Sequence, residues 1–225
     1  MITAEEKTEE VKKYMTRKVE DFNWFRRGFQ YLVTKIIYGF SYKFIYRLEV
    51  YGRENIPKTN DYVVVGNHLS TLDPPLVCNV LPHPVAYMAK QELFYHPLLK
   101  VMLDWLGTFA VNRDSVGLST IKTAKSIKNT KKWVLGLFPQ GTREKSGEIH
   151  KVTKGFIGLA KATKCSILPI GIIGTDHPKK IPFTGKIIVK IGPIIELSDN
   201  PDETFNKWIT SIQNLTGFKY VPEEG

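Results

Sequence analysis

The sequence predicts an α/β fold in which a mixed, largely buried sheet is flanked by helices and preceded by an N-terminal amphipathic helical hairpin. From residue 48 onward, short apolar runs rich in Val and Ile alternate with longer segments of helical period. This alternation is typical of strands joined by helices. Residues 22–47 carry many aromatic side chains that also repeat at helical period. We therefore divide the chain into N-terminal helices at 1–47 and an α/β domain at 48–225.

The individual elements follow from the same pattern. Strands are expected at the apolar runs 48–51, 62–66, 85–89, 108–112, 133–138, 167–173 and 186–195. Helices are expected between or after them, at 97–106, 115–129, 152–163 and 202–215. A further helix is expected to begin at Asp73, because its carboxylate suits a helix cap and Pro74 fits a first helical turn.

Composition limits the class of protein. The chain has 225 residues, enough for one domain with a substantial core and one appendage. Its formal net charge of +10 favours a polyanionic partner such as nucleic acid, an anionic membrane or a phosphorylated substrate. On charge alone, a lysine-rich surface that only aids solubility is the simpler explanation. The two cysteines, Cys78 and Cys165, lie in apolar stretches and indicate buried free thiols in a reducing compartment.

The N-terminal region lacks the pattern of a secreted or membrane-spanning segment. The first residues are too charged for a signal peptide, and no apolar run reaches the roughly 18 residues that a spanning helix needs. Segment 22–47 is expected to form two helices that fold back on each other at Gly39, with Lys35 as an exception to the amphipathic pattern. Aromatic and basic side chains on such helices are typical of a membrane interface. A hairpin packed on the core is the commoner explanation of the same pattern.

The first polar motif is Asn67-His68-Leu69-Ser70-Thr71-Leu72-Asp73, directly after the expected strand 62–66. Strand ends are where α/β proteins place functional groups. A short loop can return the carboxylate of Asp73 to one ring nitrogen of His68. The other nitrogen is then free to take a proton from a substrate hydroxyl. The spacing alone is common, and it also fits a helix cap beside an ordinary loop histidine.

The second polar motif is Phe138-Pro139-Gln140-Gly141-Thr142-Arg143-Glu144, which follows the expected strand 133–138. Gly141 lets the backbone approach an anion, Thr142 offers a hydroxyl, and Arg143 presents a planar fork that matches phosphate oxygens. A turn with an exposed arginine has the same composition. The other histidines have no partner at a metal-ligand spacing, so no metal is predicted.

Four segments, taken in order, resemble the four sequence blocks of the glycerolipid acyltransferases, specifically the 1-acylglycerol-3-phosphate acyltransferases. The segments are His68 with Asp73, then Gly-Thr-Phe-Ala-Val-Asn-Arg at 107–113, the motif at 138–144, and Ile-Leu-Pro-Ile at 167–170. Four blocks in the same order are far more specific than any one of them. With compatible flanks, the resemblance covers most of the chain.

The resemblance implies an enzyme in which His68 and Asp73 form the catalytic dyad. The dyad would deprotonate the 2-hydroxyl of lysophosphatidic acid, which then attacks an acyl thioester and gives phosphatidic acid. The thioester would belong to acyl carrier protein or coenzyme A, used as co-substrate with no other cofactor. The acyl group would move directly, without a covalent enzyme intermediate, in agreement with the absence of an obvious Ser or Cys nucleophile.

The resemblance also assigns further residues to the site. The acceptor's phosphate would be held by Arg113 and Arg143, with Lys90 as another candidate and with Gly141 and Thr142 shaping the loop. The supporting residues would be Asn67, Gln140 and Pro169. In this family Glu is usual where this chain has Gln140, so the side chain here keeps its size and hydrogen bonding but loses its charge. If His68 is the base, Gln140 has a supporting polar role.

A lipid acceptor strengthens the expectation that segment 22–47 docks on a membrane. We expect a peripheral, monotopic protein on the cytoplasmic face of the cell membrane, with anionic lipid, lysophosphatidic acid and the acyl thioester as partners. Nucleic acid is not expected, because the sequence has no recognised nucleic-acid motif. Two alternatives remain: an acyltransferase for glycerol 3-phosphate or another lysolipid, and a basic membrane-binding module without catalysis.

Overall fold

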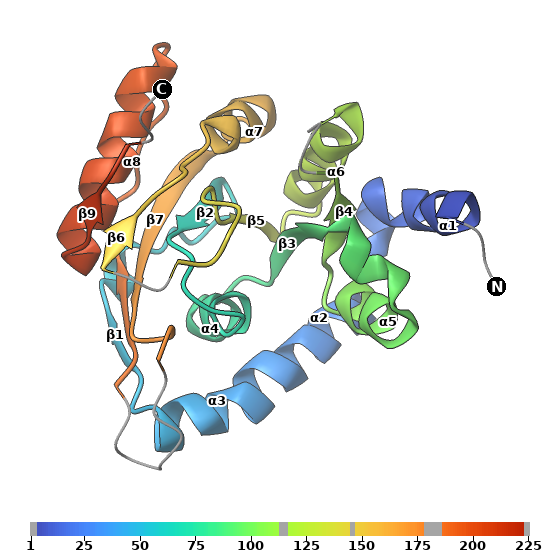
Figure 1. Ribbon diagram of the computed structural model, residues 1–225, viewed down its shortest axis with the longest axis horizontal. Coiled ribbons are helices and arrows are strands. Elements are labelled where there is room, and N and C mark those ends of the chain that lie inside the picture. The colour runs from blue at the N-terminus through green and yellow to red at the C-terminus, as the bar shows by residue number, and fades with distance from the viewer. Residues whose placement is uncertain (1–3, 113–116, 145–146, 178–185, 223–225) are drawn as a thin grey trace.

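The computed structural model describes residues 4–112, 117–144, 147–177 and 186–222. A seven-stranded sheet forms the centre, with helices on both faces (Figure 1). Its strand order is β1-β8-β7-β2-β5-β3-β4. The strands are β1 Glu49–Tyr51, β2 Tyr62–Gly66, β3 Val85–Lys90, β4 Phe109–Val111, β5 Val134–Leu137, β7 Ser166–Ile173 and β8 Ile188–Ile191. The expected α/β fold with a mixed sheet is confirmed.

The helices agree closely with the expected positions after residue 48. They are α4 Asp73–Val80, α5 Pro97–Trp105, α6 Leu118–Asn129, α7 Gly155–Thr163 and α8 Pro201–Thr216. Before the sheet come α1 Ala4–Met15, α2 Trp24–Tyr31, η2 Leu32–Ile37, α3 Tyr38–Phe40 and η3 Ser41–Ile45. Short 3₁₀ turns are η1 Val19–Asp21, η4 Arg53–Asn55 and η5 Gln91–Tyr95. The sequence pattern did not predict the two-stranded sheet of β6 Glu148–Ile149 and β9 Lys219–Tyr220.

Strand direction places the motifs at one edge of the sheet. β2 lies between β7 and β5 and is parallel to both, and β3 and β4 continue in the same direction. β8 is antiparallel to β7, and β1 is parallel to β8. The carboxyl ends of β7, β2, β5, β3 and β4 therefore share one edge, where the loops after β2 and β5 carry the two polar motifs.

The hydrophobic core has two layers, one on each face of the sheet. Alternate side chains of β2 enter different layers: Val63 and Val65 face α6, α7 and α8, whereas Tyr62 and Val64 face α4 and the helix of residues 24–45. Because both faces are covered, β2 is apolar at nearly every position instead of alternating with polar residues.

The expected hairpin at 22–47 is wrong, because α2, η2, α3 and η3 form one continuous helix over residues 24–45 (Figure 1). Two π-helical segments, η2 and η3, lie within it. Gly39 does not reverse the chain. It lies inside α3, where an added Cβ would be only 3.0 Å from Nδ2 of Asn79 on α4. The glycine therefore permits close packing between two helices, which a sequence pattern does not distinguish from a helix end.

The long helix buries polar side chains and exposes apolar ones. Gln30 and Thr34 are buried, whereas apolar side chains over the whole length of the helix are exposed. The exposed set is Trp24, Phe25, Tyr31, Leu32, Ile36, Ile37, Phe40 and Phe44. We call this set the apolar face of the helix. Among the described residues, no helix combines the length and hydropathy that crossing a bilayer requires.

Candidate active site

The loop after β2 brings the two residues of the first motif into direct contact. Nδ1 of His68 lies 2.8 Å from Oδ2 of Asp73. His68 directly follows the buried Asn67, whose side chain accepts from the backbone N–H of Ile172 at 2.7 Å and donates to the Ile172 carbonyl at 2.9 Å. These two bonds tie the start of the loop to β7. The expected proximity of His68 and Asp73 is therefore present in the structure.

The carboxylate of Asp73 is completely buried and accepts from four donors. Oδ2 accepts from the backbone N–H groups of Leu69 (2.6 Å) and Ser70 (2.7 Å) and from His68, and Oδ1 accepts from Oγ1 of Thr175 (2.5 Å). These bonds offset the cost of burying a charge.

The expectation that Asp73 caps its own helix is wrong. Leu72 is the N-cap of α4 and makes no side-chain cap bond, while Asp73 is already the first helical residue. Its carboxylate turns back to the preceding loop because the N–H groups of that loop converge on it. Proline fits the first turn of α4, as expected. The position still places a negative charge at the positive end of the helix dipole.

The imidazole of His68 has a defined tautomer and orientation. The tautomer that donates from Nδ1 to the carboxylate of Asp73 has its lone pair on Nε2. The ring stacks on Phe138, with centroids 4.4 Å apart and an angle of 17° between the planes. Phe138 in turn stacks on Tyr87 at 5.3 Å. The side chain of His68 is 16% exposed, so solvent reaches the ring although Phe138 covers one of its faces.

The loop after β5 is fastened to the histidine. Oε1 of Gln140 accepts from the backbone N–H of His68 at 2.8 Å, and the backbone N–H of Glu144 donates to the His68 carbonyl at 2.9 Å. Gln140 is buried, and its Nε2 has no hydrogen-bond partner among the described residues. The two polar motifs therefore form one site, in which Gln140 positions the backbone of His68 and keeps one donor available.

The expected phosphate-binding residues lie around the same sheet edge. Gly141 adopts φ +67°, the left-handed turn that favours glycine, and an added Cβ would meet nothing within 4 Å. Thr142 and Arg143 follow it and are exposed. Lys90 ends β3 and is exposed. Arg113 lies outside the described residues, two positions beyond the end of β4.

Pro169 lies within the sheet, away from the loops. It pairs with Val65 of β2, and its carbonyl accepts from the backbone N–H of Gly192 at 2.9 Å. On the other side of Pro169, Ile167 forms a β-bridge with Ile195, which is one residue out of the register set by Ile170 and Ile191. Because the register changes at Pro169, the missing N–H of this proline costs the sheet little hydrogen-bonding energy. The structure thus brings His68, Asp73, Asn67 and Gln140 together and assigns Pro169 to the strand beneath them.

Two residues near the site were missed in the sequence. Thr175 follows the end of β7 and holds the second oxygen of Asp73. Thr175 is a polar residue just after a strand that pairs with β2, and this position could have indicated a place near the site. Tyr87 extends the aromatic stack, and Gly136 makes room for it, since an added Cβ would lie 2.4 Å from its ring. Burial raises the pKa of the Tyr87 hydroxyl well above 10, so it stays neutral.

Comparison with known proteins identifies the family of this chain. A family model described as Acyltransferase matches residues 47–173, more than half of the chain. The chain belongs to the acyltransferase family. The expected resemblance is thereby confirmed, and the matched region contains the two loops that carry the polar motifs.

Several curated acyltransferases are similar over most of this chain, and each is named 1-acyl-sn-glycerol-3-phosphate acyltransferase. The protein from Borreliella burgdorferi is 31% identical over 67% of this chain and 62% of its own length. The proteins from Bacillus subtilis and Pseudomonas aeruginosa are 30% and 32% identical, over 68% and 76% of this chain and over 75% and 65% of their own lengths. The match to the Borreliella protein thus leaves more than a third of that relative uncovered.

A solved acyltransferase has the same fold. It is the 1-acyl-sn-glycerophosphate acyltransferase PlsC from Thermotoga maritima, with a TM-score of 0.57 and 23% identity. The match covers 94% of this chain and 82% of that one. The similarity therefore includes the N-terminal helices as well as the sheet.

Proposed function

We propose that this chain transfers an acyl group from a thioester to the 2-hydroxyl of lysophosphatidic acid, with His68 as general base and Asp73 as its partner. The observation that carries the proposal is the contact between Nδ1 of His68 and the buried carboxylate of Asp73. It leaves Nε2 as the basic atom of a partly exposed ring. The names of the curated relatives support the choice of acceptor.

In the proposed reaction, Nε2 of His68 takes the proton of the acceptor hydroxyl as its oxygen attacks the thioester carbonyl. The carboxylate of Asp73 stabilises the imidazolium that forms. The C–S bond breaks, and the thiolate receives the proton from His68 as the thiol leaves. Each electron pair is accounted for without a covalent enzyme intermediate, and acyl carrier protein and coenzyme A both supply the thioester that this scheme needs.

The acceptor carries a phosphate, and we propose that the loop after β5 and the neighbouring strand ends hold it. Arg143 is the first candidate, because its exposed guanidinium belongs to the loop that is bonded to His68. Lys90, at the end of β3, and Arg113, two positions after the end of β4 in the sequence, are further candidates. Gln140 is proposed to donate from Nε2 to an oxygen of the bound substrate, since that donor has no partner among the described residues.

We propose that the apolar face of the helix 24–45 lies in the interfacial layer of the membrane. The apolar side chains of α5 extend this surface, because Trp105 packs against Phe25 at 5.4 Å and against Phe29 at 5.3 Å. Leu98, also on α5, is 77% exposed. An exposed surface of this size and aromatic content fits a lipid surface better than water. The net charge of +10 favours the anionic cytoplasmic leaflet.

The decisive test is an acyl-transfer assay with the purified protein in lipid vesicles. His68→Ala is expected to lower kcat by about 10²–10⁴-fold, the usual contribution of a positioned general base. His150→Ala is a matched control, since His150 also forms a contact with a carboxylate but belongs to the loop near β6. Equal rates for His68→Ala and the wild type would refute the dyad. A panel of lysophosphatidic acid, glycerol 3-phosphate and other lysolipids would identify the acceptor.

A further inference from the structure

A second basic site lies at the other end of α4, away from His68. Two adjoining cavities of about 400 and 590 Å³ open there, and Lys35 and Arg53 line both. Lys43 lines the first cavity and Lys58 the second. We call the two cavities together the α4 groove. None of the residues that line them is acidic.

The positive charge in the α4 groove exceeds what the fold needs. Lys35 donates to the carbonyls of Asn79 and Leu81, the latter at 2.7 Å, and Arg53 donates to the carbonyl of Val80 at 3.1 Å. These bonds satisfy the free carbonyls at the end of α4. The end of a helix carries only about half a negative charge. The two full charges on Lys35 and Arg53 therefore leave a net positive site even before Lys43 and Lys58 are counted.

No carboxylate neutralises these charges. Among the described residues, none of the four cations of the α4 groove forms an ion pair with Asp or Glu. Instead, Lys35 and Arg53 repel each other. Burial lowers the pKa of Lys35, and the charge of Arg53 lowers it further. An anion bound in the groove would relieve both effects.

Apolar side chains line part of the α4 groove and continue into the proposed membrane surface. Phe40 and Phe44 line the first cavity and also belong to the apolar face of the helix 24–45. Ile56 and Pro57 line the second cavity. A ligand that fits this site has an anionic group for the cations and a hydrocarbon part for the adjacent apolar face. An anionic phospholipid has both.

We propose that the α4 groove binds the phosphate-bearing headgroup of an anionic phospholipid, as a site separate from the catalytic one. This rests on the proposed docking of the helix 24–45 on a membrane. Asp73 begins α4 and Val80 ends it, so the two sites are about 10 Å apart along the helix. The lipid would bind Lys35 and Arg53 from the side of the apolar face, with Lys43 and Lys58 at the rim.

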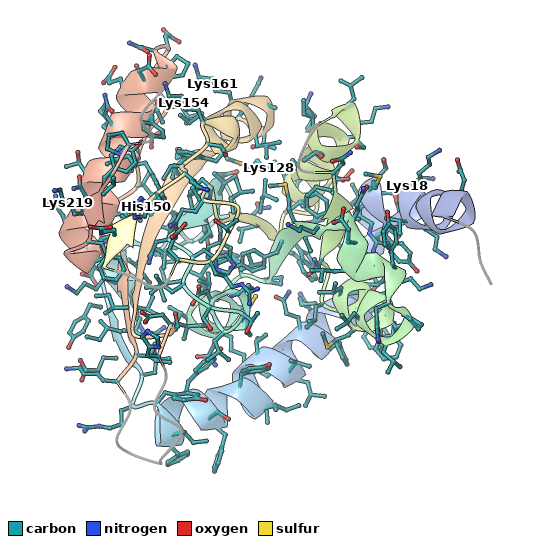
Figure 2. All side chains as sticks on the ribbon, viewed as in Figure 1. Lys18, Lys128, His150, Lys154, Lys161 and Lys219 are labelled. Carbon is teal, nitrogen blue, oxygen red and sulfur yellow. The ribbon has the colours of Figure 1, made fainter. Side chains whose placement is uncertain are left out.

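The test measures binding of soluble dihexanoyl phosphatidylglycerol to the full chain by titration calorimetry, with dihexanoyl phosphatidylcholine and inorganic phosphate as comparison ligands. The double variant Arg53→Gln, Lys58→Gln is expected to weaken phosphatidylglycerol binding by about tenfold or more, the size of one to two charge-assisted contacts. The matched control is Lys161→Gln, Lys164→Gln. It removes the same charge from Lys161 of α7 (Figure 2) and from the C-cap of that helix, on the other face of the sheet, and should not change the affinity.

Other outcomes would overturn the proposal. Equal weakening in the groove variant and in the α7 control would mean diffuse attraction by net charge. Phosphatidylcholine binding as tight as phosphatidylglycerol would remove the role of the anion, and inorganic phosphate binding as tightly as the lipid would identify a free anion as the ligand. Loss of phosphatidylglycerol binding in Arg143→Gln would place the lipid in the catalytic site. The side chain of Lys58 forms no hydrogen bond or ion pair with the described residues, so the single variant Lys58→Gln tests the groove in case the loss of Arg53 loosens α4.

The binding experiment is independent of the acyl-transfer assay. If His68→Ala left transfer unchanged, the proposed reaction would fail while the binding result would stand. If the groove variant bound phosphatidylglycerol normally, the second site would fail while the reaction would stand.

Discussion

At the scale of single residues, the catalytic proposal depends on how Asp73 is held. Its two oxygens have different partners: Oδ2 accepts from the loop and from His68, whereas Oδ1, among the residues that the structure describes, accepts from Thr175 alone. Thr175 therefore fixes the rotation of the carboxylate, and through it the ring of His68. It is a positioning residue, because it acts through Asp73 and not on the substrate.

Thr175→Val removes the hydroxyl and keeps the shape of the side chain. We expect the free energy of unfolding to fall by about 1.5–3 kcal/mol, the range for a hydrogen bond to a charged group. We also expect kcat to fall while KM stays the same, because the base is misaligned but the phosphate site is not. Urea denaturation and steady-state kinetics would measure the two effects. Thr175→Ser is the control and should behave as wild type. An impaired Thr175→Ser protein beside a normal Thr175→Val protein would assign the role to the methyl group.

Residue-scale contacts were predictable only where they are local in sequence. His68 and Asp73 are five positions apart, so one loop decides whether they meet. Thr175 is 102 residues from Asp73, and Gln140 is 72 residues from His68. Those contacts depend on the placement of β7 and β5 on either side of β2, which no local pattern specifies.

At the scale of elements, the helix 24–45 holds both ends of α4. Tyr42 donates to the carbonyl of Leu72 at 2.9 Å, directly before Asp73. Lys35 donates to carbonyls at the other end of α4. The poor fit of Lys35 to the amphipathic pattern thus has a structural reason. A helix that lies on a membrane would, through these bonds, fix the depth of the catalytic loop.

The helix 24–45 buries polar side chains and exposes apolar ones, and one substitution on each side tests this arrangement. Gln30→Leu makes the buried side more apolar, yet we expect it to destabilise the protein. Gln30 bonds to both backbone groups of Val85 and to the carbonyl of Leu106, and each group left unpaired costs about 1–3 kcal/mol. Ile37→Gln changes a side chain that is 58% exposed and should leave stability unchanged.

Vesicle binding should rank the two variants in the opposite order from stability: Ile37→Gln is the one that we expect to be impaired. Ile37→Gln is expected to weaken binding to anionic vesicles by about fivefold, since roughly 1 kcal/mol of apolar burial is lost. Sedimentation with vesicles and urea denaturation would compare the two variants. A destabilised Ile37→Gln protein with normal vesicle binding would mean that the apolar face packs against protein instead of lipid.

At the scale of the whole molecule, one core layer contains most of the buried ionisable groups. Tyr42, Tyr62, Tyr87 and Cys78 all lie between the sheet and the helices α4 and 24–45. Burial raises the pKa of Cys78 from 9.0 to about 12. Burial also raises the pKa of each of the three tyrosines above 10. All four groups are therefore neutral in the folded protein at neutral pH.

The layer should make the protein sensitive to alkali. Between about pH 9 and pH 12 the unfolded chain releases protons that the folded protein retains. Stability must therefore fall as the pH rises, by up to about 1.4 kcal/mol per pH unit for each group. Lys35 acts in the opposite direction, because its pKa is lowered, but one group does not offset four. Urea midpoints measured from pH 8 to pH 10.5 would test whether stability falls as the pH rises.

Cys78→Ala should reduce that pH dependence, because it removes the group that begins to titrate first in the unfolded chain. The expected result is a shallower fall in the free energy of unfolding between pH 9 and pH 10 than in the wild type. A constant urea midpoint across this range in the wild type would show that the layer opens to water before the chain unfolds.

The sequence by itself determined the strands of the central sheet, the helices after residue 48, the α/β class and the family, because strand runs, helix periods and ordered motifs are local patterns. It also determined that His68 and Asp73 could meet. Only the tertiary structure decided that residues 24–45 form one helix, that Asp73 faces the loop instead of capping α4, and that Lys35 and Arg53 share a groove. These features depend on which surfaces pack together, and Gly39 shows the reason: the same residue ends a helix or admits a neighbour, according to what lies beside it.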